Sequence, residues 1–113
     1  MNFNDAIARA DELRLNTASD EQKTKWLYEL ECRIAEIMGV EAPAWEFPCA
    51  RELLLPAQHD DVYVKYLVTM IDFANGENEQ YANDMAVFES AFDEACSWWI
   101  RNHRPASSGN WRV

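Results

Sequence analysis

The sequence predicts an all-α domain, and three observations carry that prediction. Between residues 81 and 99, apolar residues recur at alternating steps of four and three, the spacing of one helix face: Tyr81, Met85, Phe88, Phe92, Ala95 and Trp99. Residues 62 to 74 are apolar almost throughout, which is typical of a buried helix. Three glycines and four prolines suit helices better than a turn-rich β fold.

A short first helix is expected over residues 4–14. Asn4 can cap it, and Asp5 suits its first turn. Phe3, Ile7 and Ala10 give it a thin apolar face. Because so short a helix is not stable alone in water, it must pack on the rest of the chain.

The second helix is expected over residues 19–38. It begins with a capping-box pattern, Ser19 to Gln22, and Gly39 provides its C-terminal stop. Its inner stripe consists of Leu27, Leu30, Ile34 and Ile37. On its outer face lie charged residues four apart, which we interpret as a solvated ladder of ion pairs: Lys25, Glu29 and Arg33.

Residues 40–58 interrupt the helical pattern with three prolines. One interpretation is an extended segment that lies across the helices, with a short turn or strand near Leu53 to Leu55. The other is a surface loop with a few anchoring side chains. In either case Trp45 and Phe47 are candidate protein-interface residues, because they are large apolar side chains in a non-helical segment.

The third helix is expected over residues 60–75, capped by Asp60 or Asp61. Only Lys65, Thr69 and Asp72 interrupt its apolar sequence, and they fall on one narrow stripe. A helix apolar nearly all round is either the central helix of the domain or meets another subunit with one face. We favour the central position.

Asn75-Gly76 turns the chain, so the fourth helix, residues 77–104, forms an antiparallel hairpin with the third. Trp98 and Ile100 lie off its inner stripe and are candidate interface residues. Residues 1–104 form a single domain, and residues 105–113 a flexible tail in which Trp111 is a further interface candidate. The predicted core is Leu27, Leu30, Ile34, Leu67, Ile71, Met85, Phe88, Phe92 and Trp99.

The formal net charge of −10 argues against sequence-specific nucleic-acid binding, because a binder must neutralise phosphates. No apolar run is long enough for a membrane span, and no signal peptide is visible. Three widely spaced cysteines favour reduced thiols. We expect no catalytic, cofactor-binding or metal-binding residues, since His59 and His103 lack metal-site spacing to the cysteines and no glycine-rich phosphate loop exists.

Several stretches together resemble a known family. They are Ser19 to Lys23 with Trp26 to Leu30, Leu53 to Pro56 before Asp61 to Tyr63, Tyr66-Leu67 with Ile71 to Glu77, Tyr81 to Phe88, and Trp99 to Pro105. This pattern is similar to small head–tail connector, or head-completion, proteins of tailed bacteriophages and prophages. The likeness covers about residues 5 to 105, and the segment from Val40 to Arg51 departs from it.

The resemblance implies a structural virion protein without catalytic residues. Such a protein is located in the host cytoplasm before assembly and at the virion head–tail junction afterwards. There it binds the portal and other junction proteins, forms a homo-oligomeric ring and extends the DNA channel. An acidic wall suits that role because it repels DNA. The alternative is an acidic phage-encoded DNA mimic that inhibits a basic DNA-processing protein.

Overall fold

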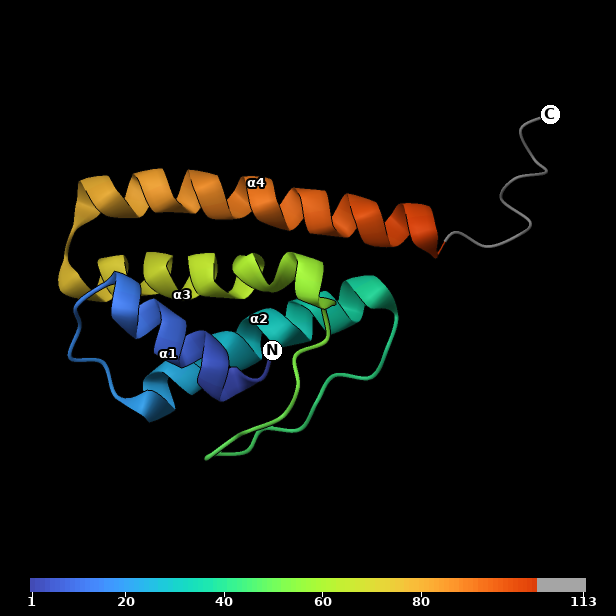
Figure 1. Ribbon diagram of the computed structural model, residues 1–113, viewed down its shortest axis with the longest axis horizontal. Coiled ribbons are helices and arrows are strands. Elements are labelled where there is room, and N and C mark those ends of the chain that lie inside the picture. The colour runs from blue at the N-terminus through green and yellow to red at the C-terminus, as the bar shows by residue number, and fades with distance from the viewer. Residues whose placement is uncertain (104–113) are drawn as a thin grey trace.

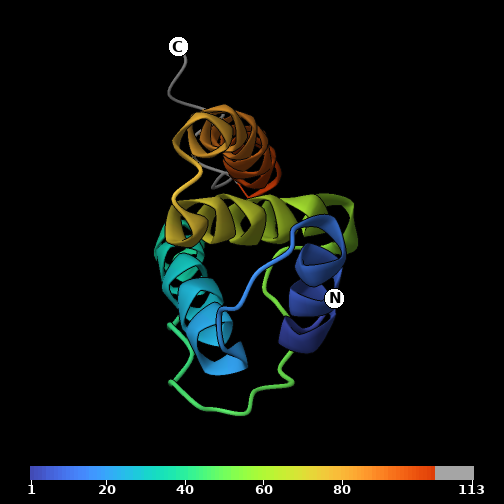
Figure 2. The same cartoon turned by 90° about the vertical axis from the view of Figure 1, so that its left-hand side faces the viewer.

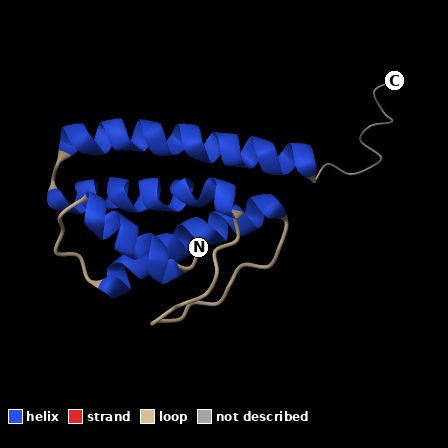
Figure 3. Ribbon diagram, viewed as in Figure 1, coloured by secondary structure: helices blue, strands red, loops and turns tan. Residues whose placement is uncertain are grey.

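The computed structural model describes residues 1–103 and confirms the all-α fold (Figure 3). Its helices are α1 (Phe3–Leu13), α2 (Asp20–Met38), the 3₁₀ turn η1 (Ala57–His59), α3 (Asp60–Asn75) and α4 (Asn78–Asn102). This part of the chain has no strand; its one β-type contact is an isolated bridge between Asn2 and Glu52. Trp111 and the predicted tail lie outside the described residues.

α3 is the central helix of the domain. α4 runs back along one side of it, and α1 and α2 both lie on the opposite side (Figures 1 and 2). This position explains why the α3 sequence is apolar around most of its circumference. Phe73 is the exception, because it lies near the end of α3 and is 64% exposed.

The first two helix starts depend on side-chain caps. Asn2, not Asn4, caps α1: its Oδ1 accepts a hydrogen bond from the Asp5 backbone N–H at 2.8 Å, and the Asp5 carboxylate accepts one from the Asn2 N–H. The earlier start brings Phe3 into the helix and into the core, where it is 1% exposed. Ser19 caps α2 as expected, accepting from the Gln22 N–H at 3.1 Å.

The other helix ends depend on the backbone. Gly39 and Gly76 end α2 and α3 with φ of 73° and 76°, the left-handed conformation that favours glycine. α3 begins through η1 without a side-chain cap, so the predicted capping role of Asp60 or Asp61 is wrong. α4 begins at Asn78, one residue later than predicted.

The predicted core is correct for its α2 and α3 members and for Phe88, all of which are buried: Leu27, Leu30, Ile34, Leu67 and Ile71. Three α4 residues are wrong as fully buried core, because Met85, Phe92 and Trp99 are only half-buried. Ile37 is wrong as an inner residue of α2, since it is 41% exposed.

The segment between α2 and η1 is a surface loop with anchoring side chains, the second of the two interpretations. Cys49, Leu53 and Leu55 are buried and fix its returning half to the core. The buried Glu31 carboxylate accepts from the Leu54 N–H and the Tyr63 hydroxyl, both at 2.7 Å. Most of the loop lies on the side of α3 opposite α4 (Figure 1), but Leu55 near its end lines a cleft together with α4 residues.

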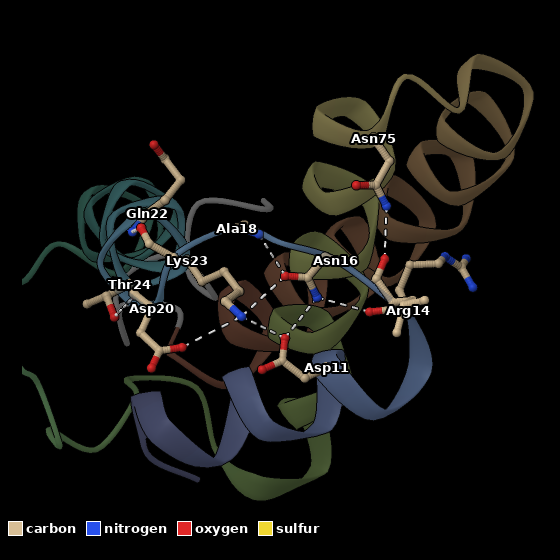
Figure 4. A network of polar contacts seen from close by, with 11 residues as sticks. Asp11, Arg14, Asn16, Ala18, Asp20, Gln22, Lys23, Thr24 and Asn75 are labelled. Atoms are coloured by element: carbon tan, nitrogen blue, oxygen red, sulfur yellow. Dashed lines mark hydrogen bonds and ion pairs between the residues drawn. The ribbon is translucent and has the colours of Figure 1, made fainter.

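Two charged networks join the helices across the connector between α1 and α2. The buried Lys23 ammonium donates to Asp11 at 2.8 Å and to Asn16 at 3.3 Å (Figure 4). The Arg14 guanidinium donates from Nε to Asp72 on α3 at 2.8 Å and from Nη2 to Asp84 on α4. Arg14 therefore ties α1 to both members of the α3–α4 pair.

Candidate protein-interaction surface

α4 is the least covered helix of the domain. Of its 25 residues, only Phe88 and Ala95 are buried. The other members of its apolar stripe are half-buried: Tyr81, Met85, Phe92 and Trp99. α3 is the helix that packs most extensively against α4, and one helix covers only one side of another. A flank of the apolar stripe therefore remains open to solvent.

The open flank forms the wall of a groove of about 490 Å³. α2 forms the facing wall through Arg33, and Tyr66 and Met70 of α3 contribute between them. The α4 wall consists of Tyr81, Met85, Phe88, Glu89, Phe92 and Asp93. We call this feature the α2–α4 groove.

The aromatic side chains of the groove pack on one another. The ring centroids of Tyr66 and Phe88 are 5.0 Å apart, and those of Phe88 and Phe92 are 5.5 Å apart. The Arg33 guanidinium lies 5.0 Å from the centroid of the Phe92 ring, a cation–π distance. Burial, followed by the nearby Glu29 charge, raises the pKa of the Tyr66 hydroxyl. The groove thus combines packed aromatic rings with a cation on the α2 wall and acids on the α4 wall.

The α2–α4 groove continues into a tight apolar cleft through Phe92, which lines both. Ile34, Ile37 and Met38 line the cleft from α2, and Cys96 and Trp99 line it from α4. The Trp99 ring also stacks on His103, with centroids 3.3 Å apart. Burial raises the pKa of the Cys96 thiol. From Tyr81 to Trp99 the two features follow about 27 Å of helix.

The charges at the edge of the groove are mainly acidic. Glu29, Glu89 and Asp93 are exposed and, within residues 1–103, form no ion pair. The predicted ladder of Lys25, Glu29 and Arg33 is wrong, because no ion pair joins these residues and the two cations lie over aromatic rings instead. Lys25 lies over Trp45 at 5.8 Å, and Arg33 over Phe92.

The interface candidates chosen from the sequence lie in two separate places. Trp45 and Phe47 are 40% and 43% exposed on the loop, where Trp45 contacts the Tyr28 ring edge-on at 5.4 Å. Trp98 is half-buried near the end of α4, with its ring centroid 5.1 Å from that of His59. Ile100 is 56% exposed and adds to the open apolar surface of α4. The first pair therefore belongs to the loop between α2 and η1, and the second to the C-terminal part of α4.

Sequence reasoning missed the groove because it assigned Met85 and Phe92 to the core and placed Tyr81 on the same helix face. Nothing in the sequence singled out Asp84, which pairs with Arg14. One signal was available: Asp72 interrupts a nearly continuous apolar helix, and a buried carboxylate requires a partner. That partner is Arg14, 58 positions away in the sequence.

Other kinds of site find no support in the part of the chain that the structure describes. No group of three or more His, Cys, Asp or Glu side chains there is arranged to hold a metal ion. Its three cysteines are free. Each helix of that part is too short or too polar to cross a lipid bilayer. No protein-family model, no curated protein and no solved structure matches this chain.

Proposed function

We propose that this chain is a structural adaptor that acts through protein–protein contacts, of the class of the tailed-phage head–tail connectors. The observation that carries the proposal is the half-covered apolar stripe of α4, which continues into the α2–α4 groove. Large apolar side chains that remain open on a rigid helix are typical of an assembly surface. The resemblance to phage connectors supplies the kind of assembly.

The charge distribution supports the same role. Glu79 and Glu94, which lie outside the α2–α4 groove, are exposed on α4 and form no ion pair within residues 1–103. In a ring of copies, such acids give a negative wall that DNA phosphates do not adhere to. The adaptor binds the portal and its own neighbours and carries out no reaction.

The test is quantitative mass spectrometry of purified phage particles from the source strain. A connector is expected in a few to a few tens of copies per particle. The matched control is a non-structural phage protein of similar size, which infected cells contain and particles lack. A chain abundant in infected cells but absent from particles would refute the adaptor role.

The exposed, unpaired acids of α4 also favour a second candidate function, an acidic DNA mimic that inhibits a basic DNA-processing protein. An inhibitor acts as a monomer or dimer and is displaced by duplex DNA, because both ligands compete for one basic surface. This alternative is favoured over the adaptor if the chain is absent from particles and forms a complex with a basic DNA-processing protein, and if added DNA fragments break up that complex.

A further inference from the structure

We propose that the α2–α4 groove binds one amphipathic helix of a partner protein, with large apolar residues on its inner face and lysines or arginines on its flanks. The inference rests on the proposed adaptor function, and it specifies the chemistry of the partner that an adaptor of this shape accepts. Three features carry it: the length of the groove, its side chains and the charges along its edges.

The length of the groove fits a helix. The α4 wall of the groove, from Tyr81 to Asp93, follows about 18 Å, which is about 12 residues or three turns of a ligand helix. Its two walls are helices, and α3 lies between them. This arrangement is the helix-in-groove mode, in which residues at i, i+3, i+4 and i+7 of the ligand fill an apolar channel.

The side chains of the groove suit large apolar residues of a ligand. Met70 and Met85 are flexible thioethers that adapt to the shape of an incoming side chain. Tyr66, Phe88 and Phe92 offer ring faces and edges already fixed by mutual contacts.

The charges determine the flanks of the ligand. Glu29 on the α2 side and Glu89 and Asp93 on the α4 side outnumber Arg33, the one basic residue that lines the groove. Arg33 lies over Phe92 and neutralises none of these acids through an ion pair in the described chain. A helix with basic flanks gains attraction along both edges, whereas an acidic helix is repelled.

The same charges disfavour a second copy of this chain as the occupant. Each copy carries a formal net charge of −10. Packing two such grooves together would bring Glu89 and Asp93 of one copy against the acids of the other. The occupant is therefore a basic helix of a different protein.

The first experiment uses a synthetic 18-residue amphipathic helix with leucines on one face and lysines on both flanks. Binding to the full chain is followed by NMR of ¹³C-labelled methionine methyl groups. We expect the Met70 and Met85 signals to shift. Met1, whose amino group lies beside Glu52, is an internal reference and should not shift. A peptide with glutamates in place of lysines should bind at least tenfold more weakly.

The second experiment uses two double variants of equal charge. Glu89→Lys with Asp93→Lys reverses the edge of the groove and should weaken binding of the lysine peptide at least tenfold. Glu79→Lys with Glu94→Lys makes the same change at exposed α4 positions that do not line the groove, and should weaken it less than twofold. Circular dichroism and thermal unfolding establish that both variants remain folded.

Three results would overturn the inference: no binding of the lysine peptide, equal binding of both peptides, or equal effects of the two double variants. Each can occur while the chain is still found in phage particles. In that case the groove assignment fails and the adaptor role stands. In the reverse case, the chain is absent from particles but the lysine peptide still binds in the groove. That result refutes the adaptor role and leaves the groove assignment standing.

Discussion

Replacing Tyr63 with phenylalanine tests how the loop between α2 and α3 is fixed to the helices. The Tyr63 side chain is fully buried. Its hydroxyl donates to Glu31 Oε1 at 2.7 Å and accepts from the Leu55 N–H at 3.0 Å. Burial and the nearby Glu31 charge raise the pKa of this hydroxyl far above its ordinary value, so it remains a donor throughout the usual pH range.

The magnitude follows from the two hydrogen bonds. A hydrogen bond to a carboxylate contributes about 1.5 to 3 kcal/mol, and a buried N–H left without an acceptor costs about 1 to 3 kcal/mol. Tyr63→Phe removes the first and creates the second at Leu55. We therefore expect the free energy of unfolding to fall by about 3 to 5 kcal/mol.

The assay is urea unfolding followed by circular dichroism, with Tyr66→Phe as the matched control. The Tyr66 hydroxyl forms no hydrogen bond within residues 1–103, so its removal should change stability by less than about 0.5 kcal/mol. Hydrogen exchange at the Leu54 and Leu55 amides should accelerate only in Tyr63→Phe. A loss below about 1 kcal/mol, or equal effects of the two variants, would refute the assigned network.

Three further predictions concern the core and the Arg14 network. Phe88→Ala should cost about 3 to 5 kcal/mol in urea unfolding, because Phe88 is 2% exposed; a loss below about 1 kcal/mol would contradict the register of α4. Arg14→Ala should lower the free energy of unfolding at pH 7 by about 2 to 4 kcal/mol, since it leaves buried Asp72 beside Asp84 without a cation. In an Asp72→Asn background the same substitution should cost less. An equal loss in both backgrounds would contradict the coupling of Arg14 to Asp72. Asp72→Asn alone should leave the free energy of unfolding at pH 7 unchanged or raise it by about 1 kcal/mol, because the new amide can donate a hydrogen bond where the buried Asp72 Oδ2 has no partner. Between pH 4 and 8, the thermal stability of this variant should depend less on pH than that of the unmodified chain. An equal pH dependence would contradict the prediction.

The sign of that pH dependence follows from the pKa of Asp72. Burial, and then the neighbouring Asp84 carboxyl, raise this pKa above the ordinary value of 3.8. The folded state therefore retains a proton that the unfolded state releases. The stability that this proton contributes is fully present below about pH 4 and is lost as the pH rises through the folded-state pKa. The pKa of Asp84 is lowered, mainly by the neighbouring Asp72 carboxyl, so the stability that Asp84 contributes is lost only below about pH 4.

Features with local causes could be predicted from the sequence. The Ser19 hydroxyl accepts from an N–H three residues later, and Gly39 and Gly76 relieve the cost of a left-handed backbone. Neither effect depends on distant contacts. The start of α1 was harder to predict, because Asn2 and Asn4 are equally good caps. The burial of Phe3 decides between them, and that burial requires the packed core.

The candidate site could not be predicted from the sequence because periodicity identifies which residues share a helix face, but not what covers that face. Tyr81, Met85, Phe88 and Phe92 share one face of α4, yet only Phe88 is buried, beneath α3. The Arg14–Asp72 pair was hidden for a related reason. Its members are 58 positions apart, and no local pattern relates them.

The length of α4 explains why part of its apolar surface remains exposed. α4 has 25 residues and α3 has 16, a difference of nine, or about 13 Å of helix. α4 therefore continues past the beginning of α3 (Figure 1). Near that end Trp98 packs on His59 and Trp99 reaches the cleft beside α2, but Ile100 remains 56% exposed. Residues 1–103 therefore leave part of the apolar surface of this long helix uncovered, and the proposed adaptor would bury it against its partner.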